Sequence, residues 1–287
     1  MTRRGFRQML FAMALLGCSG GTAGPAKADG LPVVSVDAGP TGIGTADEAL
    51  RFVTVPAGSD TVLARVAQRG GRIEASRLLR GSFTIPAVAY DGSASGLSAD
   101  GRTLVLIAPR SSFPRARTAL TVLDAPRLRT RRVIRLRGDF SFDALSPDGA
   151  RLYLIQYVAP KDPTRYLVRE YDLRSGRLLP HPVVDPTEPD EDMRGSPITR
   201  APSPDGRWAY TLYDGAGGTP FVHALDTAAG AARCIDLHLL ARRDVAAARL
   251  SVSADGARVS VVDGDGPAAV IDAATFRVSA PFAPIWR

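Results

Sequence analysis

Acidic side chains are concentrated in one segment of a chain that is otherwise basic. The 287-residue sequence has a formal net charge of +7, yet residues 185–194 place five carboxylates within eight positions. Hard oxygen ligands at this density can bind Ca²⁺, and an acidic loop can also dock a basic partner. The spacing does not match a known calcium loop, and the two prolines are equally typical of a solvated connection. We therefore name Asp190, Glu191, Asp192 and Arg194 as candidate partner-binding residues and assign no metal site.

Four further charged residues are candidates for binding because they lie in segments that read as loops between strand-like runs. They are Arg110, Lys161, Asp214 and Asp263. The Asp-Gly pairs that begin at Asp263 are explained first by turn chemistry, and only then as a ligand pair. The sequence contains no nucleophile elbow, zincin helix or phosphate-binding loop. We therefore assign no catalytic residue and expect no cofactor.

Cysteine and histidine suggest one more metal site, which we do not favour. Cys234, Asp236 and His238 alternate in the sequence and would share a face if they lay on one strand. One strand rarely surrounds a metal ion by itself, so a structural role is the better interpretation. With Cys18 in the leader described next, no intrachain disulfide is expected.

Residues 1–28 are expected to form an export signal and tether outside the fold. A twin-arginine pair and a short apolar run open the chain, and that run is too short for a mature membrane anchor. Two cleavage sites compete: residues 15–18 read LLGC, as in a bacterial lipobox, and residues 26–28 read AKA, a small-x-small site. We favour the lipobox, which predicts a lipidated Cys18 and an extracytoplasmic, lipid-anchored protein. Cleavage after Ala28 would instead release a secreted or periplasmic soluble protein.

A short repeated sequence motif, called the Ser-x-Asp-Gly phrase below, indicates the strands and turns that must position these candidate residues. Ser-x-Asp-Gly occurs four times, with its glycine at positions 101, 149, 206 and 256, so the steps are 48, 57 and 50 residues. Such a period indicates a propeller or a solenoid. Serine, aspartate and a left-handed glycine suit a type I turn with a glycine bulge. This turn chemistry explains the four aspartates better than a row of metal ligands.

Strand-like runs follow each turn and define the blades. An imperfect first unit precedes them, with residues 51–55, 62–67 and 73–79 as its last three strands. Its innermost strand is unclear, with Pro32–Val36 as a candidate and Gly42–Gly44 read as a linker. We expect an all-β fold: one β-propeller domain over residues 31–287, with about five four-stranded blades. Two β-sandwiches are the rival, but they do not explain the self-similarity.

The turns at 146–149 and 203–206, together with the segment VREYDLRSG at 168–176, resemble the bacterial TolB-like and YVTN-type propeller repeats over roughly residues 50–282. The resemblance implies a WD-repeat-like propeller that acts as a protein-binding or cell-envelope component, and it carries no catalytic motif. We therefore expect a monomeric, non-enzymatic module that binds a protein or an envelope polymer. The alternative is a metal-dependent, lactonase-like hydrolase with a central carboxylate site.

Propeller topology predicts where binding would occur. The Ser-x-Asp-Gly turns should lie at one end, and the loops that carry the candidate residues at the other. The arginine-rich stretch 127–137 fits charge protection of an edge strand, or a contact with an anionic lipid or polymer. Nucleic acid is disfavoured as a partner because this stretch lacks interleaved aromatic residues and the protein is expected outside the cell.

Overall fold

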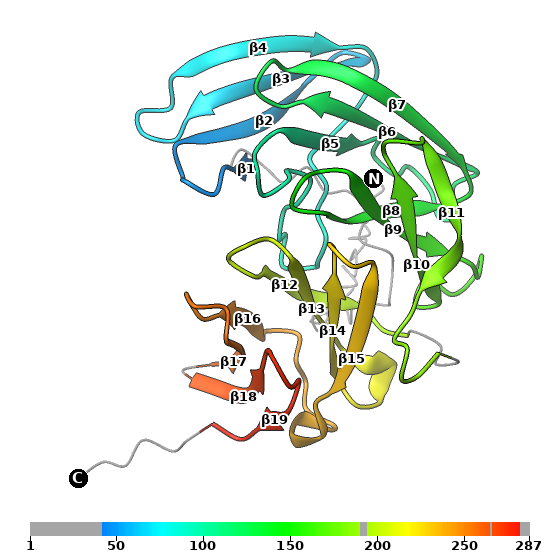
Figure 1. Cartoon of the computed structure of the whole chain (residues 1–287). Helices are drawn as coiled ribbons and strands as arrows, with labels where there is room; N and C mark the ends of the chain where they lie inside the picture. Colours follow the sequence, from blue (N-terminus) through cyan, green and yellow to red (C-terminus); the bar gives the residue numbers. More distant parts are fainter. Residues whose placement is uncertain (1–41, 190–193, 265, 282–287) are drawn as a thin grey trace, which may run out of the picture.

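Five antiparallel sheets, arranged in an arc, make up the computed structural model, which describes residues 42–189, 194–264 and 266–281 (Figure 1). Each sheet is a propeller blade whose strands follow one another in sequence from the inner edge outwards. The fold is thus an all-β propeller of five blades. In the part of the chain that the structure describes, two short 3-10 helices, η2 (Gly215–Gly217) and η3 (His238–Leu240), lie in the loops.

The strand bounds are as follows. Blade 1 has β1 (Ile43–Gly44), β2 (Leu50–Ala57), β3 (Asp60–Ala67) and β4 (Ile73–Leu79). Blade 2 has β5 (Thr103–Ile107), β6 (Arg117–Asp124) and β7 (Arg129–Arg137). Blade 3 has β8 (Phe140–Leu145), β9 (Arg151–Tyr157), β10 (Tyr166–Asp172) and β11 (Arg177–Val183). Blade 4 has β12 (Pro197–Pro202), β13 (Trp208–Tyr213), β14 (Phe221–Asp226) and β15 (Ala231–Asp236). Blade 5 has β16 (Arg249–Val252), β17 (Arg258–Asp263), β18 (Gly266–Asp272) and β19 (Val278–Ser279).

Blade 2 differs from the others at its inner edge. In place of a regular inner strand, the preceding segment makes only single bridges to β5, from Thr84 to Ile107 and from Leu97 to Leu104. The arginine-rich β7 is its outermost strand, as the edge-strand interpretation predicted.

The four Ser-x-Asp-Gly phrases form the turns that the sequence predicts. In each, the serine hydroxyl donates to the aspartate Oδ1 at 2.5–2.6 Å, and the glycine N–H donates to the serine carbonyl at 2.8–2.9 Å. The glycines have φ between +64° and +71°, where an L side chain is strained. The N–H of Asp100 also donates to the carbonyl of Pro147 at 3.2 Å, so the turns of blades 2 and 3 meet. We call this end of the propeller the turn end.

Two sequence predictions are corrected by the strands. Gly42–Gly44 is not a linker, because Ile43 and Gly44 form β1 and pair with Phe52 and Arg51 of β2. The segment that the sequence suggested for this inner strand, Pro32–Val36, lies outside the described residues. His238 does not continue the strand of Cys234, because β15 ends at Asp236 and the chain turns into η3.

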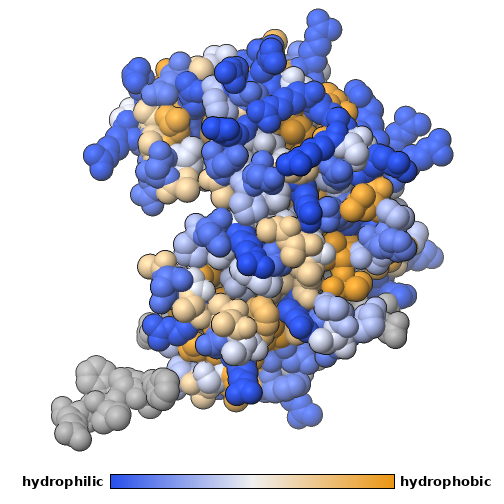
Figure 2. Space-filling view, viewed as in Figure 1, coloured by the Kyte–Doolittle hydropathy of each residue, from blue (hydrophilic) through white to orange (hydrophobic). Residues whose placement is uncertain are grey.

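Apolar residues join the blades in pairs. One buried cluster fills each seam between blades 1 and 2, 2 and 3, 3 and 4, and 4 and 5. Among the described residues, no such cluster and no strand pairing joins blade 5 to blade 1. Figure 2 shows the molecular surface hollowed on this side, between the two ends of the arc. The five blades therefore form an open ring.

Candidate functional site

A small hollow lies at the end of the propeller opposite the turns, which we call the loop end. It forms where β9 and β13 end and β10 begins, and residues 195–197 cross its mouth. Its lining includes four tyrosines, two prolines and one buried carboxylate: Tyr90, Tyr157, Tyr166, Tyr213, Pro163, Pro197 and Asp143. Its volume of about 20 Å³ accommodates one water molecule or one hydroxyl group. We call it the loop-end hollow.

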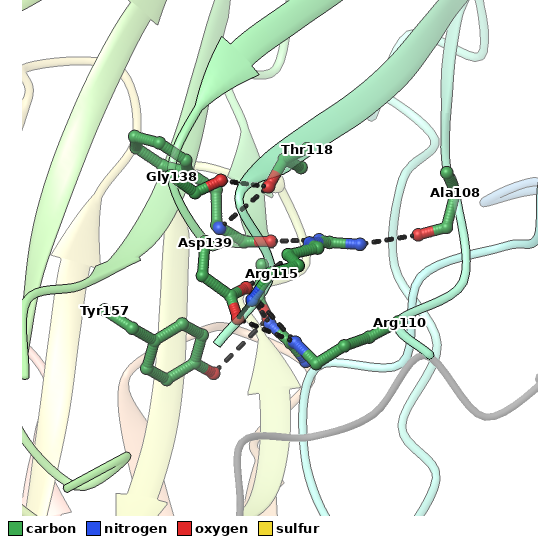
Figure 3. Close-up of polar contacts among 9 residues, drawn as sticks. Ala108, Arg110, Arg115, Thr118, Gly138, Asp139 and Tyr157 are labelled. Atoms are coloured by element: carbon green, nitrogen blue, oxygen red, sulfur yellow. Dashed lines mark hydrogen bonds and ion pairs between the residues drawn. The ribbon is translucent and has the colours of Figure 1, made fainter. Parts of the chain in front are cut away.

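A buried ion pair holds the loop beside the hollow. Arg110 donates through Nε and Nη2 to the Asp139 carboxylate, with the shortest contact at 2.7 Å, and through Nη2 to Ser141 Oγ at 2.9 Å (Figure 3). Both side chains are almost completely buried. The guanidinium also lies over the ring of Tyr157, 5.1 Å from its centroid. Arg110 is therefore a structural cation that orients Tyr157.

A second arginine reinforces the same loop. The backbone N–H of Arg115 donates to Asp139 Oδ2 at 2.9 Å, and its guanidinium donates to the carbonyls of Ala108 and Phe140 (Figure 3). Burial, assisted by the neighbouring Arg110, lowers the pKa of Arg115 to about 10. It stays charged at neutral pH, so one carboxylate is shared by two guanidinium groups.

A separate buried ion pair lies at the bottom of the hollow. Arg200 of β12 donates through Nη1 to the carbonyl of Asp143 at 2.6 Å, and through Nη2 to Asp143 Oδ1. The two side chains are 7% and 2% exposed. Because Asp143 belongs to β8, this pair ties the inner strand of blade 3 to that of blade 4.

The tyrosines form a continuous aromatic row along the seam between blades 3 and 4. Tyr157 meets Tyr166 edge-on at 6.5 Å, Tyr166 stacks with Tyr213 at 5.8 Å, and Tyr213 stacks with Phe221 at 5.1 Å. Burial raises the pKa of Tyr157 and raises that of Tyr166 well above the ordinary value. Their hydroxyl groups are therefore protonated at neutral pH and can donate hydrogen bonds.

The predicted binding residues divide into three groups. Arg110 is buried in its ion pair, whereas Lys161 and Arg194 are exposed. Asp214 caps η2 and accepts from the N–H groups of Ser196 and Ala216 at 2.8 and 2.9 Å, so it fixes the mouth of the hollow. Arg194 directly precedes the segment at the mouth, and its backbone forms an isolated antiparallel β-bridge with Arg165.

The remaining predicted residues do not join this site. Asp263 is exposed at the end of β17 in blade 5, apart from the hollow. Asp190, Glu191, Asp192 and the proposed lipidation site Cys18 lie outside the described residues. Whether any of the predicted residues binds a partner remains a prediction.

The first carboxylate of the acidic segment has a structural role. Asp185 is buried and accepts from Arg233 Nη1 at 3.1 Å and from the N–H of Cys234 at 2.9 Å. Burial favours a higher pKa for Asp185, but hydrogen bonds from Thr187 and Cys234 outweigh it and hold the pKa below its usual value. The start of the acidic loop is thus fastened to β15.

The sequence interpretation missed Asp143 and the tyrosines of the hollow. A faint signal exists for Asp143, which is the only charged residue within the apolar run FSFDAL at 140–145. Tyr157 and Tyr166 flank the predicted loop 159–165 and read as ordinary strand residues. Their importance appears only when blades 3 and 4 are placed side by side.

The chemistry available here is hydrogen bonding and aromatic contact. In the part of the chain that the structure describes, no three His, Cys, Asp or Glu side chains are grouped so that they could hold a metal ion. Asp143, which lines the hollow, and Asp139, which holds the loop beside it, are each paired with arginine. The carboxylate-metal hydrolase alternative therefore gains no support from this end of the propeller.

Comparisons with known proteins identify the fold and no closer relationship. No family model matches the sequence, and no curated protein matches it. The solved structures that resemble it include a functionally unknown protein from Desulfotomaculum acetoxidans, with 13% identity and a TM-score of 0.50, covering 83% of this chain and 67% of that one.

Two other similar structures carry names. A putative TolB from Agrobacterium tumefaciens has 15% identity and a TM-score of 0.43, covering 83% of this chain and 78% of that one. The β-propeller domain of Cps50 (Swd1) from Myceliophteria thermophila has 11% identity and a TM-score of 0.44, covering 79% and 64%. At such identities the similarity concerns the fold alone. In the described residues, no helix has the length and apolar character required to cross a membrane.

Proposed function

We propose that this protein is a non-enzymatic binding module of the cell envelope that holds a macromolecular partner at the loop end. The observation that carries the proposal is the loop-end hollow, which four tyrosines and two prolines line together with the buried carboxylate of Asp143. Tyrosine combines a large apolar surface with a polar tip, and it is enriched where proteins bind partners. Tyr90 is 36% exposed, so part of this aromatic surface faces solvent at the mouth.

The rigidity of the loop end supports a binding role. Asp139 holds the loop of blade 2, Asp214 holds the segment that crosses the mouth, and the Asp143–Arg200 pair joins two blades. A surface that is ordered before binding loses less conformational entropy when a partner arrives. The exposed side chains of Lys161 and Arg194 border this surface and would contribute charge selectivity rather than most of the affinity.

Export and anchoring complete the proposal. The leader predicts transport out of the cytoplasm and lipidation of Cys18, which would keep the propeller at the membrane as a monomer. A Cys18→Ser variant is expected to move from the membrane fraction to the soluble fraction, because a lipidated protein depends on its acyl chains for attachment. Retention of that variant in the membrane fraction would contradict the anchoring proposal.

Site-specific photocrosslinking in cells tests the binding surface. A photoreactive amino acid at Lys161, at the loop end, is expected to capture an envelope component. The same photoreactive amino acid at Arg102, which is also exposed but follows the turn of blade 2, serves as the matched control. Adducts from position 161 alone support the proposal. Adducts from position 102 alone, or equal adducts from both positions, contradict it.

A further inference from the structure

Buried polar atoms without hydrogen-bond partners gather on blades 3 and 4. Among the described residues, six such atoms come from these two blades: Asp143 Oδ2, Tyr166 OH, Arg169 Nε, Arg200 Nε, Thr211 Oγ1 and His223 Nε2. Nearly all buried polar groups in proteins are paired, so a group of unpaired ones requires a partner from outside the chain. Two of them, on Asp143 and Tyr166, belong to residues that line the loop-end hollow.

These two atoms define what the hollow can accept. Asp143 Oδ1 accepts a hydrogen bond from Arg200, whereas Asp143 Oδ2 has no donor and can accept one. Tyr166 is 5% exposed, and its hydroxyl can donate or accept. Its neighbour Tyr213 contributes to the raised pKa of Tyr166, but the two hydroxyl groups do not meet in a hydrogen bond of normal geometry. A group that donates to Asp143 and accepts from Tyr166 would satisfy both atoms.

The charges around the hollow limit which chemical group can occupy it. An ammonium group has three donors and no acceptor, and it would lie beside the Arg200 guanidinium, with Arg110 already over the ring of Tyr157. A carboxylate or phosphate would face the unpaired oxygen of Asp143. A neutral hydroxyl group is both donor and acceptor, and it fits a space of about 20 Å³.

The other residues that line the loop-end hollow indicate which kind of molecule would carry this hydroxyl group. Tyr90, Tyr157 and Pro163 also line the hollow and contribute ring surfaces to it. Sugar rings have apolar C–H faces and hydroxyl rims, which match aromatic walls around a polar floor. We propose that the loop-end hollow binds a neutral carbohydrate, one hydroxyl group of which bonds to Asp143 Oδ2 and Tyr166 OH. The inference rests on the proposed function and narrows its partner to a polysaccharide.

Loss of the Tyr166 hydroxyl provides the cleanest variant. Because this hydroxyl is buried and unpaired, Tyr166→Phe is expected to keep or slightly raise the melting temperature. Tyr171→Phe is the matched control: it lies on the same strand, and its hydroxyl donates to the carbonyl of Gly176 at 2.8 Å, away from the hollow. Asp143→Asn is the second variant, which removes the charge but preserves the size of the side chain.

The binding assay uses the purified full-length chain and neutral oligosaccharides as probes, namely maltohexaose, chitohexaose and a mannan hexasaccharide, with saturation-transfer NMR and calorimetry. We expect at least one probe to bind, Tyr166→Phe and Asp143→Asn to weaken that binding about tenfold or more, and Tyr171→Phe to leave it unchanged. Equal binding by the wild type and Tyr166→Phe would overturn the proposal. So would a lack of binding to every probe.

Two further outcomes separate this inference from the proposed function. If a high-resolution crystal structure shows a single water bridging Asp143 and Tyr166 that no probe displaces, the carbohydrate site is refuted. If crosslinking from Lys161 captures a protein with equal yield in Tyr166→Phe, the loop end binds a protein and the carbohydrate inference fails, while the proposed function stands. If crosslinking from Lys161 captures nothing, both the proposed function and the carbohydrate inference fail.

Discussion

The two seams on either side of blade 4 are built from the same strands but have different chemistry. Towards blade 5, β13 and β14 present Tyr210, Leu212, Val222 and Ala224, which join a cluster of fifteen buried apolar residues. Towards blade 3, the alternate positions of these strands present Thr211, Tyr213, Phe221 and His223. Because neighbouring side chains of a strand point to opposite faces, blade 4 can present an apolar face to blade 5 and a more polar face to blade 3.

The difference shows where the fold is optimised for stability and where it is not. The seam between blades 4 and 5 buries apolar surface, which stabilises folding directly. The seam between blades 3 and 4 buries an ion pair, a histidine and several unpaired polar atoms, each of which costs free energy. Proteins retain such costs mainly at functional sites. The comparison therefore supports the loop end of this seam as the binding site.

The largest expected effect concerns the buried ion pair. Arg200→Met leaves the Asp143 carboxylate buried without its cation, and should lower the free energy of unfolding by about 3–5 kcal/mol in urea titrations. The double variant Arg200→Met/Asp143→Leu removes both charges and should recover most of this loss. A cost below about 1 kcal/mol for the single variant would mean that the seam is hydrated and not buried.

The apolar seam should respond to loss of volume. Leu212 is completely buried between blades 4 and 5, so Leu212→Ala should lower the free energy of unfolding by about 2–5 kcal/mol. Leu239→Ala is the matched control, because Leu239 is 50% exposed, and it should change stability by less than about 0.5 kcal/mol. Similar effects of both variants would show that blade 5 is not packed against blade 4.

The polar seam should make stability depend on pH. Burial lowers the pKa of His223 to about 4, so the folded state binds fewer protons than the unfolded state between pH 4 and pH 6.5. The contribution is fully present above pH 6.5 and is lost as the pH falls towards 4, by about 3 kcal/mol in total. Urea titrations at several pH values should show this slope in the wild type and in His238→Gln. A slope that persists in His223→Gln would assign the titration to another group.

The smallest expected effect on stability is a difference between the glycines of two turns at the turn end, in blades 4 and 5. Gly206 and Gly256 both have φ of +71°, so alanine should cost about 1 kcal/mol of unfolding free energy at either position. A Cβ at Gly206 would lie 2.6 Å from the Cβ of Ala99, whereas one at Gly256 would lie 3.5 Å from Pro204, an ordinary contact. Gly206→Ala should therefore cost about 1 kcal/mol more than Gly256→Ala in thermal unfolding. Equal costs would mean that the turns of blades 2 and 4 do not touch.

Local sequence signals predicted the fold well, because its turns and strands are determined by neighbouring residues. The Ser-x-Asp-Gly phrase carries its own hydrogen bonds, and the strands follow it at regular spacing. Where a signal was short or ambiguous the prediction failed, as for the two-residue β1 and for His238, which lies beyond the end of β15.

The site was less predictable because its partners are distant in the chain. Asp143 and Arg200 are 57 residues apart, and Arg110 and Asp139 are 29 apart. The sequence placed Arg110 in a loop at the end opposite the turns, but nothing local showed that Asp139 would pair with it in a buried position. Tyr166 looked like any strand tyrosine, and its unpaired hydroxyl becomes visible only once blade 4 covers it.

Amide hydrogen exchange in the presence of an envelope polysaccharide fraction tests the central claim most directly. The loop-end segments 158–165 and 194–197 and the turn-end segments 98–102 and 203–207 are compared in the same sample. Binding at the loop end predicts slower exchange in the first two segments and no change in the other two. Protection confined to the turn end, or no change in either region while the polysaccharide is bound, would contradict the assignment of the site.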